Sequence, residues 1–170
     1  MTSTALTSHR VESPVGPLTL VGSDAGLRAI LWAGDAPARA GLADVALQPG
    51  SADVLDEAAH QLDEYFAGTR TSFDLPLDLR GTPFQVAAWE ALGDIPYGET
   101  RTYAEQAAKI GRPAAVRAVG AANGRNPLSI VLPCHRVVGS DGALRGFAGG
   151  LDAKAALLAF EQGEADRVPG

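Results

Sequence analysis

Two helix-start signals leave little freedom in how the second half of the chain can fold. Thr82-Pro83-Phe84-Gln85 combines an N-cap threonine, a proline at the first helical position and a glutamine at N3, and predicts a helix through about Gly93. Thr102-Tyr103-Ala104-Glu105 is a second capping box, and its helix is expected to end at the break Gly111-Arg112-Pro113. A third helix is expected over residues 113–123. This half should therefore be mostly helical.

The first half has strand and turn patterns instead. Residues 17–21 and 27–32 are apolar runs separated by Ser23-Asp24-Ala25-Gly26, which predicts a hairpin. The Ala-, Gly- and Pro-rich stretch 36–50 is expected to be a loop. Apolar residues at helical spacing then predict a helix that ends at Gly68.

Residues 73–79 alternate between apolar and polar side chains and predict a strand, which Pro76 would place at a sheet edge. The change of pattern near Arg80-Gly81 divides the chain into a small α/β lobe, residues 1–80, and a mostly helical lobe, residues 81–170. The expected fold class is therefore α/β, of the α+β kind, in two lobes.

The only cysteine of the 170 residues lies in Pro133-Cys134-His135-Arg136. One cysteine forms no internal disulfide, so this thiol is either a buried small hydrophobe or a reactive group. A free thiol is only roughly 3% ionised at pH 7, so a nucleophilic cysteine needs a base or a cation beside it. The neighbouring histidine and arginine favour the second interpretation. We expect the proline to hold the thiol at the rigid end of a strand-like segment, residues 128–132.

Charge is distributed unevenly along the chain, which has a net charge of −6. Residues 1–81 contain five basic and eleven acidic side chains, whereas residues 101–138 contain six basic side chains and one acidic. A basic region on an acidic protein indicates a local site for a polyanion such as nucleic acid. The basic residues are Arg101, Lys109, Arg112, Arg117, Arg125 and Arg136.

The second and third predicted helices form a helix-turn-helix candidate with Arg117 on its second helix. Alanine-rich helix pairs also occur as plain packing units, so this pattern alone leaves both interpretations open. Small side chains around Arg117 would let the helix backbone approach a ligand closely. They are Ala114, Ala115, Ala118, Ala121 and Ala122.

A last helix is expected from Leu151 to about Gln162, after a glycine-rich loop. Its Glu161 would ordinarily be solvated. His9 and His60 lack metal-ligand spacing with each other or with the cysteine, so no metal site is expected.

From residue 82 to residue 161 the chain resembles the DNA-repair domain of the O6-alkylguanine-DNA alkyltransferases, also called methylated-DNA-protein-cysteine methyltransferases. The start of the chain, Ser13-Pro14-Val15-Gly16-Pro17-Leu18, is similar to the first lobe of that family. The matching segments, in order, are Ile95-Pro96-Tyr97-Gly98, Arg117-Ala118-Val119-Gly120, Asn126-Pro127, Pro133-Cys134-His135-Arg136-Val137, Gly149-Gly150-Leu151, Lys154 and Leu157-Leu158.

The resemblance implies a ribonuclease H-like sheet with a helix, followed by a DNA-binding lobe. It also implies a single-use transfer of an alkyl group from O6-alkylguanine, and from O4-alkylthymine, to Cys134. His135 would take the thiol proton through a water, Glu161 would orient the imidazole, Asn126 would hold the turn, and Tyr103 would donate a hydrogen bond to the extruded guanine.

The same resemblance implies that Arg117 fills the stack left by the flipped nucleotide and that its helix enters the minor groove. Residues expected at the DNA are Arg117, Ala114, Ala115, Ala118, Arg112, Arg125 and Arg136. Residues expected at the substrate pocket are Val137, Phe147, Ala148 and Gly149. Many family members have tyrosine and serine where this chain has Phe147 and Ala148, so the fit of inhibitors should differ.

The expected partner is double-stranded DNA, bound by a monomer that could cluster along it, with no cofactor and no membrane contact. The start of the chain lacks the pattern of a secretion signal, and the single cysteine suits a reducing compartment, so a cytoplasmic location is expected. Two alternatives stay open. An alkyltransferase-like binding protein would mark lesions without an acceptor cysteine, and the presence of Cys134 argues against it. A cysteine hydrolase would use Cys134 and His135 as a dyad with continuous turnover.

Overall fold

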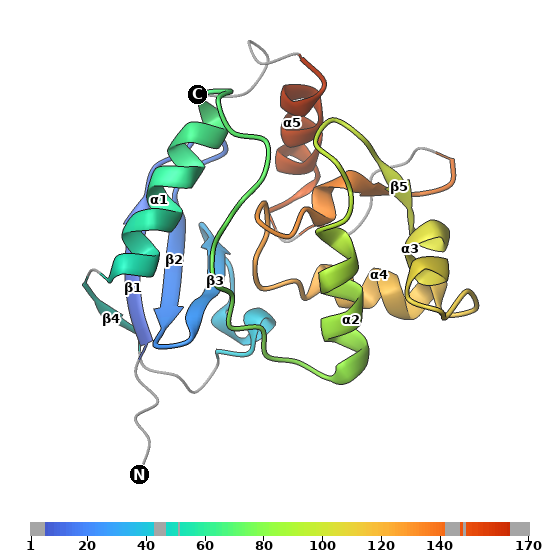
Figure 1. Ribbon diagram of the computed structural model, residues 1–170, viewed down its shortest axis with the longest axis horizontal. Helices are drawn as coiled ribbons and strands as arrows, with labels where there is room; N and C mark the ends of the chain where they lie inside the picture. Colours follow the sequence, from blue (N-terminus) through green and yellow to red (C-terminus); the bar gives the residue numbers. More distant parts are fainter. Residues whose placement is uncertain (1–5, 43–46, 51, 142–146, 148, 164–170) are drawn as a thin grey trace.

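The computed structural model describes residues 6–42, 47–50, 52–141, 147 and 149–163. Among these residues, a sheet with one α-helix and the 3-10 turn η1 (Pro37–Ala40) forms the first lobe, and the other four α-helices belong to the second lobe beside it (Figure 1). The lobes are joined through β3, where the backbone N–H of Ile30 donates to the carbonyl of Pro127 over 2.8 Å. One continuous core therefore runs through both lobes.

The first lobe is a four-stranded sheet in the order β3-β2-β1-β4, with α1 (Asp53–Phe66) packed on one face. The β2–β3 hairpin confirms the prediction from the turn residues. Two short strands were not expected. One is β1, and the other is β4, which lies inside the segment predicted to be a loop and pairs in parallel with β1. Neither has a clear alternation of buried and exposed residues. The strands are β1 (Leu6–Val11), β2 (Leu18–Ser23), β3 (Gly26–Trp32) and β4 (Leu47–Pro49).

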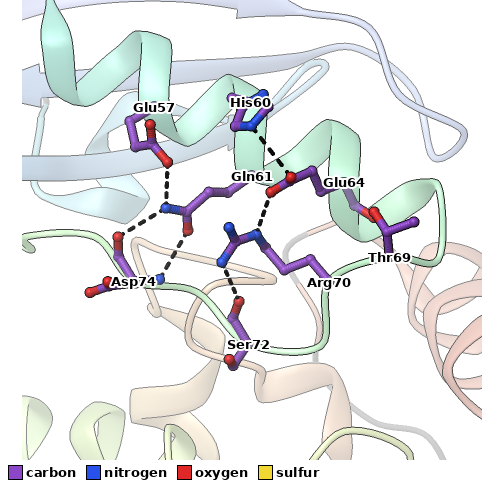
Figure 2. Close-up of polar contacts among 8 residues, drawn as sticks. All are labelled: Glu57, His60, Gln61, Glu64, Thr69, Arg70, Ser72 and Asp74. Atoms are coloured by element: carbon purple, nitrogen blue, oxygen red, sulfur yellow. Dashed lines mark hydrogen bonds and ion pairs between the residues drawn. The ribbon is translucent and has the colours of Figure 1, made fainter.

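The strand expected over residues 73–79 is wrong. Only Leu77 forms a bridge to β3, through the carbonyl of Pro76 and the N–H of Asp78, whereas the backbone of Asp74 is bound by a side chain of α1. Gln61 both donates to the carbonyl of Asp74 and accepts from its N–H, each over 2.9 Å (Figure 2). Arg70 pairs with Glu64 over 2.8 Å and fixes the start of the segment. Side-chain hydrogen bonds from Gln61 and a single bridge at Leu77 thus take the place of the expected strand pairing.

The second lobe confirms both capping boxes, at Thr82 and at Thr102, and therefore the starts of its first two helices. The third helix begins at Val116 rather than Pro113, because residues 112–115 form a turn closed by the Ala115 N–H on the carbonyl of Arg112. The elements are α2 (Pro83–Leu92), β5 (Arg101–Thr102), α3 (Tyr103–Lys109), α4 (Val116–Gly124), the 3-10 turn η2 (Cys134–Arg136), β6 (Val137–Val138) and α5 (Leu151–Glu161).

Buried amides fix the angle between α3 and α4. Gln106 and Asn123 exchange two hydrogen bonds of 2.9 and 2.7 Å, and Gln106 also donates to the carbonyl of Ala88 on α2. Both side chains are buried, so their hydrogen bonds must stay formed, and this holds α3 and α4 in one arrangement. None of the helices that the structure describes has the length and apolar composition that a bilayer crossing requires.

Candidate active site

The segment before the cysteine is a turn clasped by Asn126, not the strand-like run that we expected. The Asn126 side chain accepts from the Leu128 N–H over 3.0 Å and donates to the carbonyl of Leu132 over 2.8 Å. The Leu132 N–H in turn donates to the carbonyl of Leu128. Ile130 lies at the top of this turn with φ of 76°, a conformation that a β-branched residue rarely adopts. The predicted holding role of Asn126 thus has a geometric basis.

Cys134 begins the 3-10 turn that follows, and only 3% of its surface is exposed. The turn directs Cys134, His135 and Arg136 into the protein, because the N–H of Cys134 bonds to Leu132 and that of Arg136 to Pro133. The two residues that follow the thiol in sequence are therefore buried with it, in contact with α5.

His135 is fully buried, and its Nε2 lies 2.7 Å from Oε2 of Glu161 on α5. Since the carboxylate only accepts, Nε2 carries the proton and Nδ1 of the neutral ring is left as an acceptor. Among the described residues, Nδ1 has no hydrogen-bond partner. Burial lowers the pKa of His135 below its usual value, although Glu161 acts in the opposite direction. The ring is thus neutral and basic at one nitrogen.

Arg136 was expected at the DNA, and the structure contradicts this. Its side chain is buried and grips Glu161 at both oxygens, through Nε at 2.7 Å and Nη2 at 3.0 Å. Its Nη1 donates to the carbonyl of Ile95 over 2.6 Å. A guanidinium held in this way is not available for a phosphate, and its role is to fix the carboxylate.

Glu161 is the centre of the buried network rather than a solvated helical residue. Burial by itself would raise the pKa of Glu161, but the hydrogen bonds and charges of His135 and Arg136 outweigh it and hold the pKa at about 2. The carboxylate is therefore ionised at neutral pH and orients the imidazole.

Lys154 is a residue to which the sequence assigned no role. It is completely buried on α5, its Nζ lies 3.4 Å from the hydroxyl of Tyr103, and it sits 5.7 Å from the centre of that ring. Burial lowers the pKa of Lys154, and the charge of Cys134 opposes this. Its spacing of seven residues from Glu161, two helical turns, was the available signal that both lie on one face.

Arg117 is exposed on α4 and lines a hollow of about 460 Å³ together with Tyr103. Val116 is exposed next to it in the same hollow, and the further exposed side chains of α4, Ala118 and Ala121, are small. Arg112 and Arg125 are exposed just before and just after α4, and Ala114 and Ala115 lie in the turn that precedes it. Tyr103, expected at the substrate, and Arg117, expected at the DNA, thus line the same cavity.

The expected pocket wall lies against the first lobe. Phe147 packs edge-on against Trp32 of β3, with ring centres 5.3 Å apart, and a side chain at Gly149 would come within 2.6 Å of the same indole. Val137 is fully buried on β6. Among the described residues, these three are not part of the wall of the Arg117 hollow. Ala148 lies outside the described residues.

No group of three His, Cys, Asp or Glu side chains is placed to hold a metal ion in the described part of the chain. His60 is exposed on α1, and its Nε2 lies 3.4 Å from a carboxylate oxygen of Glu64 (Figure 2).

Comparison with known proteins gives matches over both lobes. Residues 6–79 match the ribonuclease-like domain of 6-O-methylguanine DNA methyltransferase, and residues 83–163 match its DNA-binding domain. A methylated-DNA–protein-cysteine methyltransferase of Methanosarcina barkeri is 49% identical over 152 residues, which are 89% of this chain and 94% of the relative. A protein of the same name from Mycolicibacterium paratuberculosis is 49% identical over 154 residues, 89% of this chain and 90% of that protein.

Among solved structures, Mycobacterium tuberculosis OGT in complex with DNA superposes with a TM-score of 0.82 at 44% identity, over 94% of each chain. This agrees with the two-lobe fold described above. With both lobes matched, and with relatives of this identity over most of their length, the chain belongs to the 6-O-methylguanine DNA methyltransferase family.

Proposed function

We propose that the protein repairs DNA by moving an alkyl group from O6 of guanine to Sγ of Cys134, once per molecule. The observation that carries this is the buried imidazole of His135, next in sequence to the thiol, with Nε2 held by Glu161 and Nδ1 left as an acceptor. That arrangement supplies the base which an unassisted thiol lacks at neutral pH.

In the proposed reaction, Nδ1 of His135 accepts the thiol proton through a water molecule. The thiolate attacks the alkyl carbon, a carbon–sulfur bond forms as the carbon–O6 bond breaks, and the electron pair of that bond passes to the guanine. Tyr103 donates a proton to the departing base, which balances the proton that Cys134 lost. The thioether is stable, so no free thiol is regenerated.

Lys154 supports two of these steps. An ammonium near Cys134 favours the thiolate over the thiol, and its contact with the Tyr103 hydroxyl holds that donor at the cavity. The lysine thus links the attacking and the leaving sides of the reaction.

We propose further that α3, the turn and α4 bind duplex DNA through the minor groove, with the target nucleotide extruded. O6 is stacked inside a duplex and cannot reach a buried thiol, so the base must leave the helix at a cost of a few kcal/mol. The small exposed side chains Ala118 and Ala121 of α4 support a close approach to DNA, and the exposed position of Arg117 at the Tyr103 cavity supports our proposal that it fills the vacated stack. We expect a monomer to suffice for one lesion.

The proposal is tested by incubating the protein with excess O6-methylguanine DNA and measuring its intact mass. We expect a gain of one methyl group on Cys134 and one equivalent of repaired base. Continuous turnover would indicate a hydrolase instead, and DNA binding without any mass gain would indicate a protein that only marks lesions.

Arg117→Ala is expected to slow transfer from duplex DNA, and to leave transfer from free O6-benzylguanine nearly unchanged. The free base needs no extrusion, so only the duplex reaction should depend on a residue that fills the stack. Single-turnover rates at saturating protein measure both reactions.

Arg125→Ala is the matched control, because Arg125 is exposed at the other end of α4. If Arg125 contacts a phosphate, Arg125→Ala should weaken DNA binding and lower the salt dependence of that binding by about one counterion. The transfer rate on duplex DNA should then be restored at saturating protein. An equal loss for Arg117→Ala on the free base would show that the residue shapes the pocket instead.

A further inference from the structure

The carboxylate of Glu161 has a partner from the other lobe. The hydroxyl of Tyr65, near the end of α1, donates to Oε2 of Glu161, the same oxygen that accepts from His135 and from Nη2 of Arg136. Tyr65 is completely buried. Burial first, and then the neighbouring carboxylate, raises the pKa of Tyr65, so its hydroxyl keeps its proton and remains a donor.

Tyr65 is held firmly in this position. Its ring packs against Phe73, Tyr97 and Phe160, which come from the connecting segment, from the second lobe and from α5. One turn earlier on α1, Gln61 clamps the backbone of the connecting segment (Figure 2). The hydroxyl therefore reaches Glu161 from a rigid support, which fixes the plane of the carboxylate as well as its charge.

We propose that Tyr65 is a positioning residue of the transfer reaction, through which the first lobe orients Glu161 and limits the basicity that Glu161 confers on His135. The inference rests on the proposed role of His135 as the base. A carboxylate oxygen shared among three donors stabilises the imidazolium less than one shared between two. Without the hydroxyl, His135 binds its proton more tightly, and Glu161 is held only by His135 and Arg136.

Several charged or titratable groups surround this carboxylate. Tyr97 lies between α2 and β5, and burial and then Glu161 raise its pKa. His135 and Arg136 belong to η2, and Lys154 acts on His135 from α5. Tyr65→Phe removes none of these groups and keeps the ring contacts of Tyr65, so it isolates the effect of the hydroxyl on them.

The test is the pKa of His135, followed by NMR of the intact protein with labelled histidine. The chain has only three histidines, so His9 and His60 serve as internal references. In Tyr65→Phe we expect the pKa of His135 to rise by roughly half to one unit, and the acid limb of the rate profile to move by the same amount. The maximal transfer rate should fall roughly tenfold, because a base that is held less firmly keeps only part of its effect.

Phe66→Leu is the matched control. Phe66 is the next residue on α1 and packs against the rings of Tyr65 and Phe160, but it has no polar group to offer Glu161. It should lower the melting temperature and leave the pKa of His135 in place. The proposal is overturned if Tyr65→Phe leaves that pKa unmoved, or if Phe66→Leu moves it equally. Because the titration needs no DNA, it decides on Tyr65 even if the parent protein transfers no alkyl group.

Discussion

Cys134→Ala is expected to abolish alkyl transfer completely and to leave DNA affinity unchanged. The chain has no other cysteine, so no second thiol can accept the group. The side chain is buried behind the turn after Asn126, whereas the side chains proposed to meet DNA are exposed on and around α4. Intact mass after incubation with O6-methylguanine DNA, and a binding titration on the same duplex, measure the two properties.

Cys134→Ser is the more stringent test, because it keeps the size of the side chain and replaces the thiol with a hydroxyl group. An alcohol ionises so much less readily than a thiol that His135 should not activate it at neutral pH. Mass gained by either variant, or methyl groups found on another residue of the parent, would disprove Cys134 as the acceptor.

Glu161→Gln is expected to have the second largest effect, on both rate and stability. Loss of the charge leaves the Arg136 guanidinium buried without its counter-ion, and breaking such a buried pair costs roughly 3–5 kcal/mol. The imidazolium of His135 also loses its stabilisation, so transfer should slow by roughly 100-fold. Thermal unfolding and single-turnover transfer separate the two losses.

The double variant Glu161→Gln with Arg136→Met distinguishes the two effects. Removing the orphaned cation should recover much of the melting temperature, since a buried pair is often replaced by apolar groups without loss. It should not recover the rate, because the partner of His135 is still missing. Recovery of both the melting temperature and the transfer rate would mean that Glu161 acts only as the counter-ion of Arg136 and not as the partner of His135.

Acid stability follows from the same carboxylate. The pKa of Glu161 is about 2 in the folded protein, against 4.5 for an unperturbed glutamate, so folding favours the ionised form. This contribution is complete above about pH 4.5 and is lost as the pH falls towards 2. The parent should therefore lose more stability than Glu161→Gln over that interval.

Local signals in the sequence predicted the parts of the fold that are stabilised locally. The capping boxes at Thr82 and Thr102 satisfy backbone groups within a few residues, and the β2–β3 hairpin is closed by its own turn. The strand expected over residues 73–79 is reduced to one bridge at Leu77, and a distant side chain, that of Gln61, takes both backbone bonds of Asp74. Likewise the turn before Cys134 depends on the side chain of Asn126, so the apolar run of residues 128–132 alone could not reveal it.

Prediction of the site was limited in the same way. Cys134 and its neighbouring histidine stand out in the sequence, but nothing in it shows that Arg136 turns inward and binds Glu161. Tyr65 gave no signal, because an aromatic residue on an apolar helix face is ordinarily part of the core. Its hydroxyl gains a role only when α1 and α5 meet, which is a property of the tertiary fold.

The burial of Cys134 also bears on how long an unused molecule keeps its capacity. An activated thiol is a side chain that is easily oxidised, and oxidation of this one to the sulfinic or sulfonic acid would be as final as alkylation, since the chain has no second cysteine to take over its role. With 3% of its surface exposed, the thiol meets dissolved peroxide rarely. The packing that positions Sγ of Cys134 therefore also protects a thiol that can accept an alkyl group only once, until the protein meets a lesion.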